Sequence, residues 1–274
     1  MAVTRPSLFL LGLAAATSLL LGGCSAGGTA GKTSDGPATD NSLAAIQESG
    51  RLIVGTEGTY KPFTYHKDGT GDLTGYDVEI IRAVGEKLGV EVTFEETQWD
   101  AIFAGLEAGR FAVIANQVSI NEQRSAQYEF SAPYTVSPGV IVVKEGTTDI
   151  ASFADLNGKT TAQSLTSNWY KLAKENGANV EAVEGWAQAV ALLEQDRVDA
   201  TVNDSLTFLD YQKQNADSGL KIAAETDEPS RSAFAFVKGN IELRDAVDEA
   251  IGELRADGTL AEISNEYFGA DVTE

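Results

Sequence analysis

The chain has 274 residues, 43% of them hydrophobic and 22% charged, which is the composition of a globular protein with one large domain or two modest ones. Its formal net charge of -21 argues against binding of nucleic acid or anionic lipid through the folded body. The chain contains one cysteine, so it cannot form an internal disulfide.

The first 24 residues predict the cellular compartment. Arg5 precedes an apolar run from Leu8 to Leu21, which is short for a membrane span and typical of a signal peptide over residues 1–23. The run ends in the sequence LGGC, and small residues before a lone Cys24 resemble the lipobox of bacterial lipoproteins. The resemblance implies lipidation of Cys24 and an anchor on the extracytoplasmic face of the membrane. The alternative is an ordinary signal peptide that contains a cysteine. Residues 24–42 are rich in Gly, Ser, Thr and Asp, which predicts a flexible linker.

From Leu52 onward, short apolar strands alternate with amphipathic helices, which is the pattern of βαβ units in an α/β fold. One such series precedes the apolar strand PGVIVVK, and a second series precedes the similar strand SAFAFVK. Two long strands of this kind predict crossovers between two lobes. We expect the first lobe at 43–138 plus 237–274 and the second at 139–236; a single nine-strand sheet is the alternative. The predicted strands are 52–56, 90–94, 111–115, 138–144, 160–163, 180–184, 198–203, 220–224 and 232–238, and the predicted helices are 75–88, 99–108, 167–176, 186–194, 206–214, 242–256 and 260–268.

The segment from Trp99 to Arg124 reads as helix, strand, loop and short helix. The polar stretch 116–119 is expected to be a loop after the strand 111–115, where open α/β sheets bind small ligands. Asn121 is the expected N-cap of the short helix that carries Arg124. A guanidinium in this place can hold a carboxylate through two parallel charge-assisted hydrogen bonds. The alternative is a surface arginine paired with an acidic neighbour, Glu122 or Glu129.

Polar residues also follow two strands of the second series. Thr166 or Ser167 is expected to cap a helix, and the N–H groups at that helix start would also suit a carboxylate. Asp204 ends a strand, so it can pair with an ammonium group or cap the helix that follows. Together with Arg124, these groups fit a zwitterionic amino acid.

In the first series, Tyr60 and Trp99 stand at the ends of elements, where an aromatic ring can stack on a ligand or belong to the core. Glu57 follows the first strand and can accept from an ammonium group or be solvated.

Catalysis is poorly supported by the sequence. His66 is the only histidine and lies in a Lys-Asp-Gly turn, and no Gly-rich phosphate loop or His/Cys metal spacing is present. We therefore expect no catalytic residue, no cofactor and no metal. A dehydratase-type enzyme on the same fold, the competing functional class, would need an acid–base pair in its cleft, and Glu57 is the one visible candidate.

Several separate blocks of sequence resemble the family-3 solute-binding proteins of polar amino-acid ABC importers. They are VGTEGTYKPFTY, LTGYDVEIIRAVGEKLGV, TQWDAIFAGLEAGRFAVIANQVSINEQR, YEFSAPYTVS and NEYFGADVT, within residues 50–274. The resemblance implies the two-lobed periplasmic-binding-protein (type II) fold with two crossover strands. It also implies that a monomer captures a ligand by hinge closure and delivers it to a membrane permease and its ATPase. A receptor-kinase sensor domain is disfavoured, because no transmembrane segment follows residue 24.

Within that family, GTEGTY, TQWDAIFAGL, AQSLTSN and the triplet Asn116-Gln117-Val118 resemble the cystine-binding members. L-Cystine is therefore the favoured ligand, and glutamine, glutamate or a basic amino acid are the alternatives. Gln117 and Leu165 stand where many relatives have glycine, and Leu165 leaves the shape of its loop in doubt.

The resemblance also implies a role for each candidate residue. The α-carboxylate of the ligand would be bound by Arg124 and by N–H groups around Thr166 and Ser167. The α-ammonium would be bound by Asp204, with help from the Gln117 carbonyl and Ser119. The side chain of the ligand would lie between Tyr60 and Trp99, and its polar far end would contact Glu57 and Gln163.

Overall fold

The structure is a computed structural model and describes residues 42–274. The expected signal peptide, the lipidation site Cys24 and all but the last residue of the expected linker lie outside the described residues. In the described part of the chain, no helix combines the length and the apolar character needed to cross a membrane.

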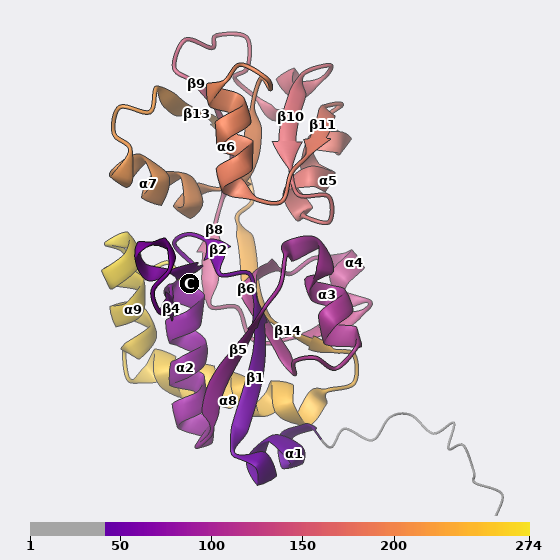
Figure 1. The fold of residues 1–274 in the computed structure, drawn as a ribbon, viewed down its shortest axis with the longest axis vertical. Helices are drawn as coiled ribbons and strands as arrows, with labels where there is room; N and C mark the ends of the chain where they lie inside the picture. Colours follow the sequence, from indigo (N-terminus) through magenta and orange to yellow (C-terminus); the bar gives the residue numbers. More distant parts are fainter. Residues whose placement is uncertain (1–41) are drawn as a thin grey trace, which may run out of the picture. The chain divides into compact units, whose positions relative to one another are not determined.

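The first lobe is built on a six-stranded sheet in the order β5-β1-β6-β14-β7, with β8 beside β14 (Figure 1). Strand β1 pairs in parallel with β5 and β6, whereas β14 runs antiparallel to β6, β7 and β8. The strands are β1 (Arg51–Thr56), β5 (Glu91–Glu96), β6 (Val113–Ser119), β7 (Tyr128–Phe130), β8 (Thr135–Ser137) and β14 (Ser230–Val237).

Helices cover both faces of this sheet, which explains why β6 is buried along its whole length. In β6, Val113 and Ala115 pack against α1, α2, α8 and α9, whereas Ile114 and Val118 pack against α3 on the opposite face. The helices are α1 (Ser42–Ser49), α2 (Tyr76–Leu88), α3 (Trp99–Glu107), α4 (Glu122–Ser125), α8 (Ile241–Ala256) and α9 (Thr259–Phe268).

The second lobe has a smaller sheet of the same kind. Strand β9 lies between β12 and β13, and a bridge between Thr161 and Ala200 links them to the parallel pair β10 and β11. Val140 and Val142 of β9 face α6 and α7, and the alternating residues Ile141 and Val143 face α5. The elements are β9 (Gly139–Lys144), β10 (Thr160–Gln163), α5 (Asn168–Glu175), β11 (Asn179–Ala182), α6 (Trp186–Glu194), β12 (Thr201–Asp204), α7 (Ser205–Gln214) and β13 (Leu220–Glu225).

Short elements complete the fold beside these two sheets. A small antiparallel sheet follows β1, and two 3-10 turns interrupt the connections. They are β2 (Thr59–Tyr60), β3 (Thr64–His66), β4 (Leu73–Thr74), η1 (Lys67–Gly69) and η2 (Phe153–Leu156).

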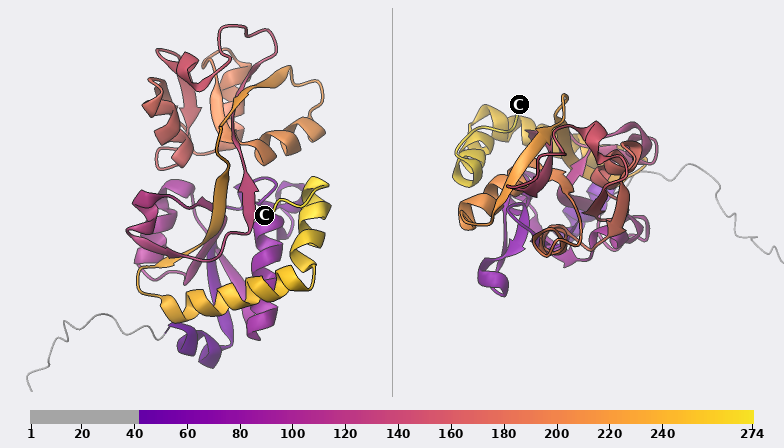
Figure 2. Two further views of the ribbon diagram at one scale, coloured as in Figure 1. Left: turned by 180° about the vertical axis from the view of Figure 1, so that it is seen from behind. Right: turned by 90° about the horizontal axis from the view of Figure 1, so that it is seen from above.

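Two strand connections join the lobes, as Figures 1 and 2 show from both sides. One runs from β8 into β9 and the other from β13 into β14, and they lie side by side, because Thr226 N donates to Gly139 O at 2.8 Å. The predicted two-lobed α/β fold is confirmed, and the alternative of one nine-strand sheet is wrong. The strand that ends in SAFAFVK lies in the first sheet along its whole length. Ser230 to Phe236 therefore pair with strands of the first lobe, although they were expected in the second.

Two local expectations also need correction. Residues 116–119 are not a loop, because β6 continues through them to Ser119, where it pairs with Ser232 of β14. The polar side chains of this stretch thus come from the carboxyl-terminal half of a fully buried strand. Helix α1 was not expected, and it forms because Leu43 and Ile46 pack on the first-lobe core.

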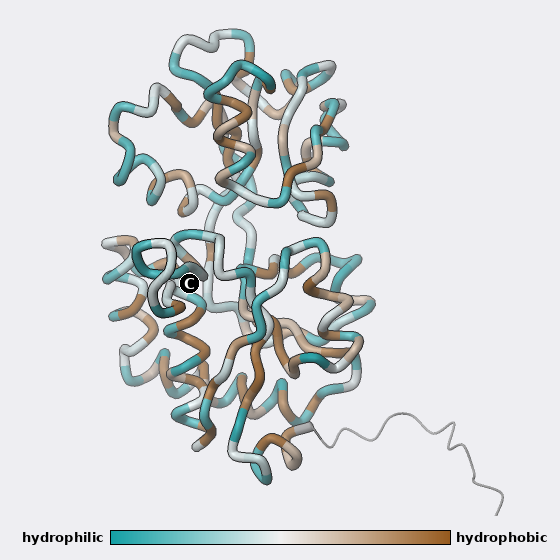
Figure 3. Tube along the Cα trace, viewed as in Figure 1, coloured by the Kyte–Doolittle hydropathy of each residue, from teal (hydrophilic) through white to brown (hydrophobic). Residues whose placement is uncertain are grey.

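Figure 3 shows the resulting distribution of apolar residues. Brown, hydrophobic stretches follow the central strands of the first lobe and recur along its helices, where they alternate with teal, hydrophilic stretches. This alternation is typical of amphipathic helices that turn one side toward a sheet and the other toward water.

Gly75 fixes the start of α2 and provides a test of this packing. Its φ of 128° is in the region that favours glycine, and an added Cβ would lie 2.2 Å from Phe63 O. We expect Gly75→Ala to lower the free energy of unfolding by about 1–3 kcal/mol in urea titrations. Gly252→Ala, in the middle of α8 with open space around it, is the control and should stabilise by about 0.5–1 kcal/mol. Equal stability of the two variants would contradict this account.

Candidate functional site

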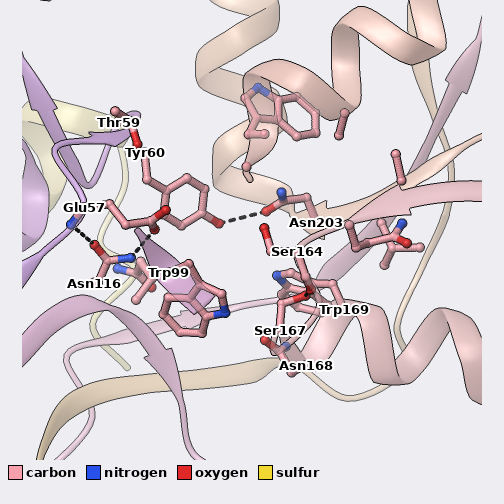
Figure 4. Close-up of a pocket in the computed structure, with 17 residues that line it drawn as sticks. Glu57, Thr59, Tyr60, Trp99, Asn116, Ser164, Ser167, Asn168, Trp169 and Asn203 are labelled. Atoms are coloured by element: carbon pink, nitrogen blue, oxygen red, sulfur yellow. Dashed lines mark hydrogen bonds between the residues drawn. The ribbon is translucent and has the colours of Figure 1, made fainter. Parts of the chain in front are cut away.

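A pocket lies between the two lobes, and both contribute side chains to it (Figure 4). From the first lobe come the turn after β1, the start of α3 and the second half of β6. From the second lobe come the end of β10, the starts of α5 and α6, and the end of β12. Carboxyl ends of strands from both sheets thus meet at one place, where α/β sheets bind ligands.

Glu57 and Asn116 form a pair on the first-lobe wall of the pocket. The Glu57 backbone N donates to Asn116 Oδ1 at 2.8 Å, and Asn116 Nδ2 donates to Glu57 Oε2 at 2.5 Å (Figure 4). Removal from water raises the pKa of Glu57 to about 7. The carboxylate is held in place without a cation, so a positively charged ligand group can lower its pKa again.

Gln117 is held from behind by Asp77, which lies in the first turn of α2. Asp77 accepts hydrogen bonds from Gln117 N at 2.6 Å, Gln117 Nε2 at 2.8 Å and the Tyr134 hydroxyl at 2.9 Å. Gln117 Nε2 also donates to Thr135 Oγ1 at 3.0 Å. These contacts hold Gln117 at a φ of 48° and leave its Oε1 buried without a partner. Burial also raises the pKa of Asp77 to about 7.

Tyr60 and Asn203 connect the two lobes at the back of the pocket. The Tyr60 hydroxyl donates to Asn203 Oδ1 at 2.8 Å and accepts from Thr207 Oγ1 at 3.1 Å (Figure 4). Trp99 opens α3 and also lines the pocket, and its buried Nε1 has no hydrogen-bond partner. Both aromatic residues therefore lie where a ligand side chain would contact them.

Arg124 lies beside the pocket rather than in its lining. Its Nη1 donates to Ser119 O at 3.0 Å and its Nη2 to Thr166 O at 3.2 Å, across the lobes. The guanidinium stacks on Trp99 and Phe103, 5.2 and 5.4 Å from the ring centroids. It is 8% exposed, forms no ion pair with any carboxylate of residues 42–274, and burial lowers its pKa to about 10. The expected N-cap, Asn121, is confirmed, because its side chain accepts from Arg124 N.

Asp204 is the N-cap of α7, the second of the two roles left open for it. Its Oδ1 accepts from Leu206 N at 2.9 Å, and its Oδ2 accepts from the Ser137 hydroxyl at 2.6 Å. The side chain is 3% exposed, and burial raises its pKa to about 6. It lies next to Asn203, which does line the pocket.

The backbone at Thr166 and Ser167 is already hydrogen-bonded. Thr166 N and Oγ1 donate to Asp100 Oδ1 at 3.0 and 2.8 Å, which is a contact between the lobes. Ser167 N donates to Ser164 O at 3.1 Å, while Ser167 Oγ caps α5 by accepting from Tyr170 N. The N–H groups expected to meet a carboxylate are thus occupied, although Ser167 lines the pocket.

Gln163 ends β10 and faces the pocket. Its Oε1 accepts from Thr161 Oγ1 at 2.9 Å, and its Nε2 is buried without a partner. Six of the predicted residues line the pocket: Glu57, Tyr60, Trp99, Gln117, Gln163 and Ser167. The other four lie behind or beside it: Ser119, Arg124, Thr166 and Asp204.

Several lining residues were missed from the sequence. Asn203 and Asn116 end or lie within strands next to chosen residues, so the strand-end rule could have included them. Trp186 begins the helix that follows β11, and Ser167 was chosen because it stands at the corresponding place after β10. Trp169 gave no such signal. Within residues 42–274, no three His, Cys, Asp or Glu side chains are grouped to hold a metal ion.

A small pocket closed by two α/β lobes, which two strands connect, defines a class: two-lobed proteins that bind a solute between their lobes. The family model of the bacterial extracellular solute-binding proteins, family 3, matches residues 52–270. The chain belongs to this family.

Three relatives illustrate the similarity of this chain to known proteins in sequence and in structure. L-cystine-binding protein TcyA of Bacillus subtilis (strain 168) is 50% identical over 254 residues, which cover 93% of this chain and 94% of the relative. The L-cystine solute receptor of Neisseria gonorrhoeae, in an unliganded open conformation, is 50% identical with a TM-score of 0.58, and the match covers 85% of this chain and 99% of that one. An ancestral arginine-binding protein bound to arginine is 37% identical with a TM-score of 0.75, covering 80% and 98%.

Asp204 predicts a specific dependence of stability on pH in the ligand-free protein. Its pKa is raised from 3.8 to about 6, so its contribution to stability is present below about pH 4 and is lost as pH rises through 6. Asp204→Asn keeps an acceptor for Leu206 N but does not titrate. The wild type should therefore lose on the order of 2 kcal/mol relative to this variant between pH 4 and 7.5 in urea unfolding. If the stability of the wild type and of the variant changed with pH in the same way, burial would not raise the pKa of the Asp204 carboxyl.

Proposed function

We propose that the protein binds L-cystine between its two lobes and delivers it to the permease and ATPase of an ABC importer. The main support is that three buried polar atoms of residues lining the pocket have no hydrogen-bond partner. They are the donors Trp99 Nε1 and Gln163 Nε2 and the acceptor Gln117 Oε1. An unpaired buried polar group costs about 1–3 kcal/mol, so a ligand that offers both donors and acceptors is stabilised here. A zwitterionic amino acid does so.

The carboxylate of one amino-acid end is assigned to Arg124. Its guanidinium is desolvated and, among the residues that the structure describes, donates to two carbonyl groups, Ser119 O and Thr166 O. A ligand carboxylate can replace the bond to Thr166 and neutralise the charge of Arg124. The ammonium of the same end is assigned to Asp204 and Gln117 Oε1. Asp204 has lone pairs left after accepting one bond at each oxygen.

The far end of the ligand is assigned to the other side of the pocket. Glu57, with its carboxylate fixed by Asn116, would receive the second ammonium of L-cystine. Tyr60 and Trp99 would flank the disulfide. Two 50% identical relatives named for L-cystine support this ligand over arginine, which the 37% identical ancestral protein binds.

Lobe closure is part of the proposal. Asp100, Tyr60 and Arg124 of the first lobe already bond the second lobe. The TM-score is lower for the open, unliganded receptor than for the arginine-bound protein, although the receptor is more similar in sequence. The processed protein would be a monomer without catalytic activity or cofactor, anchored through a lipid on Cys24 at the extracytoplasmic face of the membrane.

Calorimetric titration of residues 25–274, unfolded and refolded to remove carried-over ligand, tests the function. L-Cystine should bind one to one with a Kd of about 1 μM or less, and glutamine and arginine at least about tenfold more weakly. Binding of a different amino acid alone would overturn the ligand and keep the family role. If no amino acid binds and an absorbance assay shows turnover of prephenate or arogenate, the dehydratase class would be favoured instead.

Two substitutions test the zwitterion assignment. Arg124→Ala and Asp204→Asn should each weaken L-cystine binding by at least about 30-fold, because each removes one partner of a buried charge pair. Arg110→Ala is the control for Arg124, since Arg110 is exposed and pairs only with Glu95 in the described chain, at 3.8 Å. Unfolding midpoints no lower than that of the wild type would separate the loss of binding from a loss of folding. Affinity within about threefold of the wild type would remove the residue concerned from the site.

A further inference from the structure

We infer that Trp169 forms a wall of the ligand site and that Gly139 sets how far this wall reaches into the pocket, so that the two residues select ligands by size. The inference rests on the proposed function, because it concerns the same pocket and takes L-cystine as its ligand. Neither residue was selected from the sequence as part of the site.

Gly139 leaves a gap at the end of a row of apolar side chains. Strand β9 turns every second residue toward α5, and Ile141 and Val143 on that face are buried in the second-lobe core. The indole of Trp169 fills the place that a side chain at 139 would take, because an added Cβ would lie 2.3 Å from Trp169 Cζ3 and 2.8 Å from Cη2. The φ of Gly139 is not in the left-handed region, so the ring, and not the backbone, requires glycine here.

The backbone of Gly139 is held on both sides and cannot easily move away from the ring. Gly139 N donates to Thr226 Oγ1 at 3.0 Å, and Thr226 N donates to Gly139 O at 2.8 Å. On the opposite side of the strand, Gly139 pairs with Asp204 of β12. Trp169 also packs against the core between β9 and α5, which is closely packed and yields little. A larger side chain at 139 would therefore push the indole toward the pocket.

Trp169 is part of the pocket lining, next to Ser167 and Asn168 at the start of α5 (Figure 4). It is half-buried, so the ring is both packed on the core and open to the pocket. Aromatic side chains bury a large apolar area and are common in the walls of small-molecule sites. A ligand held between the lobes would meet Trp99 from the first lobe and Trp169 from the second, and the position of this second indole would limit its size.

A double-mutant cycle on Gly139 and Trp169, measured by calorimetric titration with L-cystine, tests this coupling. Gly139→Ala should weaken binding at least about tenfold, because the displaced indole narrows the pocket. Trp169→Leu removes the ring, and in that background Gly139→Ala should change the affinity less than about threefold. Gly146→Ala is the control, because Gly146 is exposed beyond the other end of β9 and an added Cβ there meets nothing within 4 Å.

Two results of the cycle would overturn the inference and leave the proposed function intact. One is an equal loss from Gly139→Ala in both backgrounds, which would place the effect in the connecting strand and not in the ring. The other is an affinity within about threefold of the wild type for both single variants, which would show that the contact serves the fold alone. A wild type that binds no amino acid would instead overturn the proposed function, and the inference with it. Urea unfolding of each variant identifies any loss that comes from the fold.

Ligand size gives a second test that does not depend on Gly139→Ala. L-Homocystine keeps the disulfide and both amino-acid ends of L-cystine and adds one methylene on each side. The wild type should prefer L-cystine at least about tenfold, since an apolar pocket distinguishes one methylene by about 10–200-fold. Trp169→Leu moves the wall back, so this preference should narrow by about fivefold or more. Equal preference in the wild type and in Trp169→Leu would overturn the selection of ligand size by this residue.

Discussion

The carboxylate of Asp77 fixes the first-lobe side of the pocket. It is fully buried at the first turn of α2, forms no ion pair within residues 42–274, and is held by the N-terminal dipole and three hydrogen-bond donors. Two of those donors belong to Gln117, so Asp77 determines both the left-handed backbone and the amide orientation of that residue. Gln117 follows Asn116, which in turn holds Glu57. One buried acid thus determines which atoms the first lobe presents to the pocket.

The site keeps several charges away from water and away from one another. Arg124 and Asp204 are both more than nine-tenths buried, yet neither forms an ion pair within residues 42–274. Burial shifts the pKa of each toward its neutral form, which means that the folded protein holds them at a cost in stability. In the proposed complex, a zwitterionic ligand would offset that cost at both residues. The same feature therefore weakens the empty protein and favours the occupied one, as is common at binding sites.

The sequence predicts most elements because hydrophobic periodicity and strand ends are local signals. Gln163 and Ser167 were selected because each stands at a strand end or a helix start, and both line the pocket. The prediction of a loop at residues 116–119 was wrong, because β6 continues there by pairing with β14, a strand more than 100 residues away in the sequence. The sequence also could not show that Thr166 N is occupied, since its acceptor, Asp100, belongs to the other lobe. A contact between the lobes produces no periodic pattern in the sequence of either segment.

The contacts between the lobes near the pocket are mostly polar. Asp100 with Thr166, Tyr60 with Asn203, and Arg124 with Thr166 each exchange a hydrogen bond that water could replace. The net contribution of such bonds is only about 0.5–1.5 kcal/mol each, because bonds to water are lost when they form. A ligand shifts the equilibrium between open and closed lobes only by the difference between its contacts in the two states. Arg124 and Asp204 come from different lobes. On the proposed assignment a zwitterion would therefore contact both only when the lobes are together, and its two charges would provide that difference.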